Sequence, residues 1–243
     1  SENTLIAIEK GKAGRYDDFY EAFAKKLEMR IVDEPKIDRK MDTYTKRIYD
    51  AVEYYELDKI KRYTNKSAEI LEPYKDCLWY GDLYAAVCAL RDYYTKQKMV
   101  SKEDRILLSK MIGEFSKQWD DMIKSIVFCS AFHDLESDEY EKRFEEFEIE
   151  SNEAACNKVN VLIYYVVKGY TRKINQLYEA LEKEWQEKKN YIRLIDLYNS
   201  ILLYNSHYDV TEVNEVRTKI EQVIDSTEIP KYKTVEVFYN LGC

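Results

Sequence analysis

Apolar side chains recur at spacings of three and four residues along most of this chain, which is the period of an amphipathic helix. Three segments read as two such stripes separated by a short break: residues 38–72, 154–188 and 190–226. The breaks fall near Glu56, at Gly169 and near His207. Each segment therefore predicts one pair of antiparallel helices. The pairs measure 35 to 37 residues, close to the roughly 34 of a tetratricopeptide repeat.

The middle of the chain holds the longest uninterrupted apolar stripe. Ser101, with Asp104 three residues later, resembles a capping box at a helix start. From there one seam continues at alternating steps of four and three through Leu108, Ile112, Phe115, Trp119, Met122 and Ile126. We expect a single helix of about 30 residues and about 45 Å here. A further helix is predicted over residues 74–96.

An acidic segment follows over residues 134–153. It holds ten acidic side chains against Lys142 and Arg143, with Phe144, Phe147 and Ile149 between them. A solvated helix or linker face is the favoured interpretation of such a charge run. A docking site for a basic partner is the alternative.

The composition indicates an all-α fold. Six Gly and three Pro in 243 residues leave little turn material for a sheet protein, while Lys, Glu, Leu and Gln favour helices. We expect a superhelical stack of antiparallel helix pairs, tetratricopeptide-like in architecture, over residues 38–243. The full repeat consensus W-x-x-L-G-x-x-Y is absent, so homology to those repeats stays open. Such a stack leaves a concave groove suited to an extended peptide or to a helix of another protein.

Hydropathy, cysteine usage and charge limit where the protein works. No apolar run approaches the roughly 20 residues of a membrane-spanning helix, and no charged-then-apolar signal opens the chain. Five cysteines without a close pair suit a reducing compartment, so we expect a soluble, cytoplasmic protein with no membrane partner. The net charge of −8 argues against nucleic-acid binding by most of the chain. Residues 1–30 carry six basic and six acidic side chains, and only they could face DNA.

The stretch over residues 3–29 gives the main indication of function. A short apolar run over residues 5–8 ends at Gly11, and Gly just past the last periodic residue is a helix-stop signal. A second helix is predicted over residues 17–29, with an apolar face of Phe19, Phe23 and Leu27. An ordinary short helix-Gly-helix hairpin would give the same pattern.

The sequence of this stretch resembles the second half of a helix-turn-helix domain of the XRE/Cro type. The residues that carry the resemblance are T-L-x-A-I-E-K-G-K and then D-D-F-Y-E-A-F-A-K-K-L. In that family the pattern covers the end of the DNA-recognition helix, the turn after it and the next core helix. The resemblance implies DNA contacts by Asn3, Thr4, Lys10 and Lys12. It also implies two further helices before Ser1, so the sequence is expected to be a fragment of a longer regulator.

The resemblance divides the chain into three parts. Residues 1–30 correspond to the carboxyl-terminal remnant of the helix-turn-helix domain. Residues 31–37 are expected to be a linker, because IVDEP has no helical period and Pro35 disfavours a helical residue before it. Residues 38–243 form the repeat domain.

This domain order resembles the cytoplasmic peptide-pheromone regulators of the Rgg and PlcR type. Those proteins join an amino-terminal XRE domain to a repeat domain that dimerises and binds a short signalling peptide. The resemblance implies a bacterial transcriptional regulator, a homodimer that binds duplex DNA through its complete amino-terminal domain and senses a peptide or small ligand. A helical-repeat adaptor that binds a protein partner and has no DNA role is the alternative.

Four side chains are candidates for holding a ligand in the repeat domain. Asn both donates and accepts hydrogen bonds, as the backbone amides of an extended peptide require. Asn157, Asn160 and Tyr164 fall three and four residues apart on one predicted helical face, and Asn199 interrupts an apolar stripe. A buried carboxamide without partners costs about 1–3 kcal/mol, so each Asn caps local structure or faces a cavity. For each Asn taken singly, a satisfied core or surface residue is the commoner case.

Motifs that carry enzyme chemistry are absent from the sequence. There is no Gly-rich phosphate loop and no G-x-S-x-G. Cys129 and His133 stand four apart and could share a helix face, but a closed zinc site needs four ligands. A packed thiol beside a helix-end imidazole is the favoured interpretation. We expect no enzyme activity, no catalytic residue, no metal and no cofactor.

Overall fold

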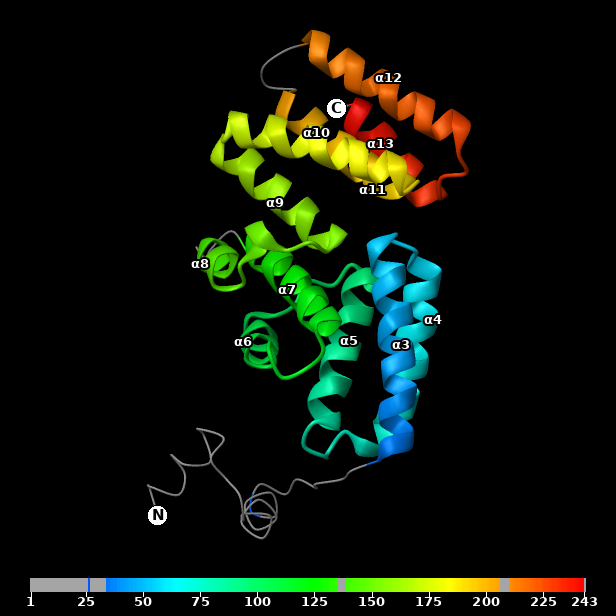
Figure 1. Ribbon diagram of the computed structural model, residues 1–243, viewed down its shortest axis with the longest axis vertical. Helices are drawn as coiled ribbons and strands as arrows, with labels where there is room; N and C mark the ends of the chain where they lie inside the picture. The colour runs from blue at the N-terminus through cyan, green and yellow to red at the C-terminus, as the bar shows by residue number, and fades with distance from the viewer. Residues whose placement is uncertain (1–25, 27–33, 135–138, 206–209, 243) are drawn as a thin grey trace.

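Helices make up the regular structure of the described part of the chain. The computed structural model describes residues 26, 34–134, 139–205 and 210–242. In these residues eleven α-helices, α3 to α13, and two short 3-10 helices follow one another without a strand, so the expected all-α class is confirmed. Figure 1 shows α3, α4 and α5 side by side at one end of the molecule and α10 to α13 gathered at the other, with α7 and α9 between them. A tetratricopeptide-like superhelix remains a prediction.

The first described helix, α3 (Pro35–Glu53), begins inside the expected linker. Pro35 takes the first helical turn, where its missing N–H leaves no hydrogen bond unmade. Ile37 is already buried in the core. Residues 35–37 therefore belong to the helix, and the linker predicted over residues 31–37 is too long. The expected remnant over residues 1–30, with Asn3, Thr4, Lys10 and Lys12, lies outside the described residues apart from Lys26.

The first predicted helix pair is formed by α3 and α4 (Leu57–Leu71), which pack against each other. The chain reverses over residues 54–56, where Tyr55 has φ +54°. Next come a 3-10 turn (Glu72–Tyr74) and α5 (Tyr80–Lys96), which packs on α4. The helix predicted over residues 74–96 therefore starts later than expected. Fully buried side chains from these three helices include Ile48, Val52, Ile60, Leu71 and Leu90.

The long central stripe is two helices and not one. A turn separates α6 (Lys102–Lys110) from α7 (Lys117–Phe132), and Gly113 in this turn has φ +93°, which suits glycine. The prediction of a single helix of about 30 residues is wrong. Both helices direct apolar residues into the same core, so the spacing continues across the break. The cap predicted at Ser101 is confirmed, because its Oγ accepts a hydrogen bond from the Asp104 N–H at 3.1 Å.

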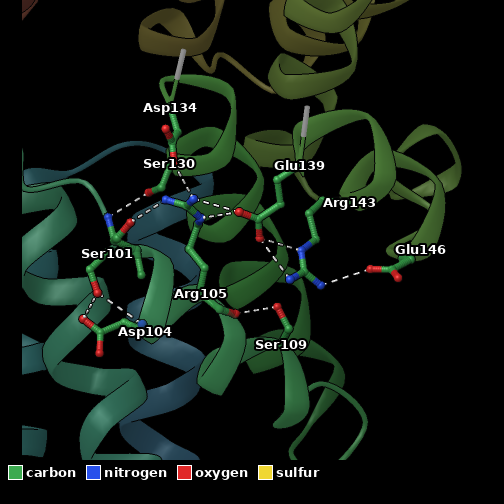
Figure 2. Close-up of polar contacts among 10 residues, drawn as sticks. Ser101, Asp104, Arg105, Ser109, Ser130, Asp134, Glu139, Arg143 and Glu146 are labelled. Atoms are coloured by element: carbon green, nitrogen blue, oxygen red, sulfur yellow. Dashed lines mark hydrogen bonds and ion pairs between the residues drawn. The ribbon is translucent and has the colours of Figure 1, made fainter. Parts of the chain in front are cut away.

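The side chain of Arg105 ties α6 to the acidic segment that follows α7. It is 3% exposed, and its Nη2 donates to Asp134 Oδ2 at 2.6 Å. Nε and Nη2 of Arg105 donate to Glu139 Oε2 at 3.0 and 2.7 Å. Figure 2 shows Arg143 holding the other oxygen of Glu139, with Nε and Nη2 each at 3.0 Å. Two carboxylates of the acidic run thus offset one buried guanidinium.

The rest of that segment also packs against the body. Phe144 in α8 (Glu139–Glu146) is buried, as are Phe147 and Ile149 after it. The Phe144 ring stacks on Tyr164 with 3.8 Å between centroids. The interpretation of residues 134–153 as a solvated face is therefore wrong for the apolar positions, because their neighbours lie far away in the sequence.

The remaining helices follow the predicted breaks and add one helix that was not predicted. The two predicted pairs are α9 (Ala155–Lys168) with α10 (Thr171–Glu187) and α11 (Tyr191–Asn205) with α12 (Val210–Ser226). Gly169 ends α9 with φ +67°, as expected for a glycine cap. The unpredicted helix is α13 (Lys231–Gly242), which packs on α11. None of the helices in the described part has the length and apolar character that crossing a membrane requires.

Replacing Arg105 by Met should destabilise the protein. The change leaves the Asp134 and Glu139 carboxylates without their buried partner, so we expect the free energy of unfolding to fall by about 3 kcal/mol. Urea denaturation followed by circular dichroism measures this loss. The matched control is Lys142→Met, whose side chain is 71% exposed and which should change stability by less than about 0.5 kcal/mol. Equal effects of the two variants would contradict the structural role of Arg105.

The same network predicts a loss of stability in acid. Burial raises the pKa of Glu139, the hydrogen bonds from Arg105 and Arg143 lower it, and the net shift is below the ordinary value of 4.5. A carboxyl with a lowered pKa in the folded state contributes stability above pH 4.5 that is lost as the pH falls through the lowered value. The stability difference between the native protein and Glu139→Gln should therefore shrink below pH 4.5. A constant difference between pH 3 and pH 7 would contradict this.

Candidate functional site

A cavity lies between the bundle of α3, α4 and α5 and the bundle of α10 to α13, which are the two halves of the molecule. Its volume is about 570 Å³, and its walls come from α5, α7, α9, α11 and α13 together with the turn after α3. In Figure 1 α5 lies in the bundle that contains α3, α11 and α13 lie in the bundle that contains α12, and α7 and α9 lie between the two bundles. A cavity of roughly 300–1,000 Å³ at a junction between helices is typical of a ligand site.

One wall of the cavity is aromatic and aliphatic. Tyr93 and Tyr94 of α5 meet edge to face with 5.0 Å between centroids, and Tyr94 meets Tyr55 in the same way at 5.7 Å. Burial raises the pKa of Tyr93 and of Tyr94, so both are uncharged phenols. The other apolar side chains of the lining are Phe132, Val159, Ile163, Val166 and Val167. An apolar lining of this kind favours a ligand with an apolar body.

Arg193 of α11 is the polar centre of the cavity lining and also joins the two halves. It is 3% exposed. Its Nη2 donates to the Val52 carbonyl at 2.6 Å, and its Nε donates to the Glu53 carbonyl at 3.2 Å. Both carbonyls are in the last turn of α3, where the helix dipole favours a cation. A third donor, Nη1, bonds Asp196 Oδ2 at 3.1 Å.

Lys233 of α13 completes this charged cluster. Its Nζ lies 2.5 Å from Asp196 Oδ1 and 4.7 Å from the centroid of the Tyr55 ring. The Glu53 carboxylate does not line the cavity, because it accepts the Ala155 N–H at the start of α9 at 2.8 Å. Among the Lys, Arg, Asp and Glu side chains that line the cavity, two are cations and one is a carboxylate. The excess of positive charge favours a ligand with an acidic group.

Two of the four predicted ligand residues, Asn160 of α9 and Asn199 of α11, line this cavity. Each is 5% exposed. The Asn160 amide donates to Ser125 Oγ at 3.1 Å. Neither Nδ2 nor Oδ1 of Asn199 has a hydrogen-bond partner among the described residues. Asn199 therefore offers the cavity both a donor and an acceptor.

The other two predicted residues do not line this cavity. Asn157 is fully buried, and its amide donates to the Asp121 carbonyl at 2.9 Å, which packs α9 against α7. Tyr164 stacks on Phe144 and lines a separate hollow beside α8. Asn157 and Asn160 of α9 thus both bond α7, whereas Tyr164 packs against α8.

Two thiols also line the cavity. Burial raises the pKa of Cys129 and that of Cys156, the latter to about 12, so both are protonated at neutral pH. Cys129 is hydrogen-bonded to Tyr93, and His133 packs edge-on against Phe132 with 5.5 Å between centroids. Across the described ranges no three His, Cys, Asp or Glu side chains are grouped so that they could hold a metal ion.

The sequence alone does not single out Arg193, Asp196 or Lys233. The two carbonyls that Arg193 binds are 140 and 141 residues away along the chain, and no local pattern marks such a pair. The available signal was weak: two charged residues three apart within the apolar stripe of residues 190–205.

The chain matches no family model, no curated protein and no solved structure.

Cys156 should resist alkylation in the native protein. It is 4% exposed and its pKa is about 12, so at pH 8 only roughly one molecule in ten thousand carries the reactive thiolate. Treatment with iodoacetamide at pH 8 and peptide mass spectrometry should leave Cys156 unmodified. The same residue should react fully in urea, which serves as the control. Rapid modification of the native protein would contradict a closed wall at this position.

Proposed function

We propose that the described helices are the ligand-sensing part of a cytoplasmic bacterial transcriptional regulator. In this proposal the cavity binds a short peptide or small ligand, and binding controls DNA recognition by the complete amino-terminal domain. The observation that carries the proposal is the Asn199 carboxamide, which is buried at the cavity with no partner for either polar atom. A buried polar group that makes no hydrogen bond costs about 1–3 kcal/mol, a cost that a ligand contact would offset.

The lining residues support a ligand with three features. The Asn199 amide is complementary to another amide, because each supplies one donor and one acceptor. The wall around Tyr93 and Tyr94 suits an apolar body. Arg193 and Lys233 are two cations beside one carboxylate, Asp196, among the lining residues, and this excess suits a carboxylate ligand. A short apolar peptide with a free carboxyl end combines all three.

A route from the cavity to the amino terminus runs along α3. Arg193 bonds the carbonyls of Val52 and Glu53 at one end of this helix, and the other end begins at Pro35. A ligand held between α11 and α5 would favour one spacing of the two halves. Because α3 is a continuous helix of 19 residues, a shift at one end moves the other end with it. Residues 1–30 precede it in the sequence, separated from it by residues 31–34.

The DNA-binding part of the proposal rests on the resemblance of residues 3–27 to the XRE/Cro family. Asn3, Thr4, Lys10 and Lys12 are the residues proposed to approach the duplex. The homodimer belongs to the same proposal, since regulators of this type read paired half-sites.

A protein-binding adaptor without a DNA role is the second candidate. The observation that favours it is an apolar face on α13, where Val235, Phe238 and Tyr239 are 67%, 54% and 72% exposed. Their spacing of three and four residues places them on one side of the helix. An exposed apolar face of this kind is typical of a protein-interaction surface.

Replacing Asn199 by Leu separates a ligand residue from a structural one. Without ligand, the free energy of unfolding should stay constant or rise by about 1 kcal/mol, because the change removes unpaired polar atoms. Asn157→Leu is the matched control: the Oδ1 of Asn157 has no partner either, but its Nδ2 donates to the Asp121 backbone carbonyl, so the loss of that bond should lower the free energy of unfolding by about 1–3 kcal/mol. Urea denaturation measures both. A large loss of stability in Asn199→Leu would mean that Asn199 is a structural residue.

Ligand binding can be tested with the same variant. Pools of synthetic five- to seven-residue apolar peptides with free carboxyl ends should contain members that raise the melting temperature of the native protein. Those peptides should not stabilise Asn199→Leu, and Asn160→Ala should weaken their binding by about 1–2 kcal/mol. Peptides that stabilise native protein and Asn199→Leu equally would place the site elsewhere.

The DNA role is tested in the full-length protein. Its binding to genomic duplex fragments should weaken steeply between 50 and 200 mM salt, by about tenfold or more. The double variant Lys10→Glu with Lys12→Glu should lose that binding while keeping its melting temperature. If the double variant binds DNA unchanged and a protein partner is captured through α13, the adaptor is the correct assignment.

A further inference from the structure

A second cavity lies at the end of the molecule where α3 and α5 begin. Its volume is about 390 Å³, and it shares no lining residue with the cavity between the halves. The walls are the first turns of α3, the turn before α5, the turn between α6 and α7, and the start of α7. In Figure 1 these elements lie at the end opposite α12.

Four of its ten lining residues are aromatic. Two of them, Tyr80 and Trp119, are buried and fixed in orientation: the Tyr80 hydroxyl donates to Asp38 at 2.8 Å, and Trp119 Nε1 donates to Thr45 at 2.8 Å. The third, Trp79, is 46% exposed. Its ring lies 4.8 Å from the ring of Phe115, centroid to centroid.

The charge of this cavity has one sign. Asp38 and Asp42, one turn apart on α3, line it, and no Lys, Arg or His does. Asp42 is exposed and makes no hydrogen bond or ion pair with another described residue. Aromatic faces also carry a negative potential, so the rings and the carboxylates act in the same direction.

The backbone holds Trp79 in this position at a cost. Trp79 has φ +64° and ψ −60°, and the Tyr80 N–H bonds the Leu78 carbonyl at 2.6 Å. A residue with a side chain is strained there, and glycine would be the ordinary choice. The backbone also packs closely just after Trp79. A Cβ on Gly81 would lie 2.5 Å from the Lys75 carbonyl oxygen, so only glycine fits at this position. Strained residues of this kind are concentrated at sites that hold ligands.

We infer that this cavity binds a small organic cation, specifically a molecule with a quaternary ammonium group. Such a group has no N–H to donate and is weakly hydrated, so it gains from the faces of Trp79 and Phe115 and from the nearby charge of Asp42. An ordinary ammonium is more strongly hydrated, and the rings cannot replace its water contacts; only the Asp38 and Asp42 carboxylates could accept its N–H groups. This inference is independent of the ligand in the central cavity.

Calorimetric titration of the whole chain tests the inference, with choline as the probe and 3,3-dimethylbutan-1-ol as its uncharged analogue of the same shape. Choline should bind at one site with an affinity about tenfold or more above that of the alcohol, because only choline carries the charge. Equal binding of the two compounds would overturn the inference. So would the absence of heat and of tryptophan fluorescence change with choline up to 50 mM.

Variants locate the site. Asp42→Asn should weaken choline binding about 3- to 10-fold and leave the alcohol unaffected. The matched control is Asp50→Asn, which removes the same charge from an exposed position of α3 outside the cavity and should have no effect. Trp79→Gly removes the ring but suits the positive φ, so the protein should fold and lose most of its choline affinity. Equal effects of the two Asp variants, or native affinity in Trp79→Gly, would place the cation elsewhere.

Discussion

The buried guanidinium of Arg193 holds the two halves of this protein at a fixed spacing. A charge removed from water is costly unless its donors all find acceptors. Arg193 places three of its five N–H groups on two carbonyls at the end of α3 and on Asp196, and the Tyr55 ring lies 5.2 Å from its Cζ. Burial lowers the pKa of Arg193 and the Asp196 carboxylate raises it, with a net upward shift, so the group stays charged. Few other separations of α3 and α11 would satisfy these acceptors together.

The central cavity follows from this constraint. With α11 held against the end of α3, the residues one and two turns further along α11 lie opposite α5, α7 and α9 across a gap that their side chains do not fill. Asn199 is six residues beyond Arg193, about 9 Å along the helix axis. Its amide is therefore placed by the same contact that joins the halves.

The sequence predicts those features whose cause is local. The helix pairs, the Ser101 cap and the turn at Gly169 follow from spacing and from residue types within a few positions. The break at Gly113 was missed because the apolar period of α6 runs on into α7. Asn199 could be named as a candidate because a carboxamide interrupts an apolar stripe. Its neighbours Arg193 and Lys233 could not, since their roles depend on contacts with distant segments.

The acidic segment over residues 134–153 shows that the same limit applies to charged residues. Ten carboxylates in twenty residues suggest solvation, but Glu139 is held between Arg105 and Arg143. Composition counts charges and cannot say which of them are neutralised by a partner from another helix. The aromatic cavity beside Trp79 is hidden for a related reason, since its rings come from two distant segments, residues 79–80 and 115–119.

The position of α13 has a consequence for biosynthesis. This helix supplies Lys233, which closes the charged side of the central cavity, yet it is the last described helix of the chain. During translation the earlier helices emerge first and can pack while the cavity still lacks one wall. The cavity is complete only when residues 231–242 have left the ribosome and docked on α11, so a chain interrupted before that point would keep most of its helices but lack the Lys233 side of the cavity.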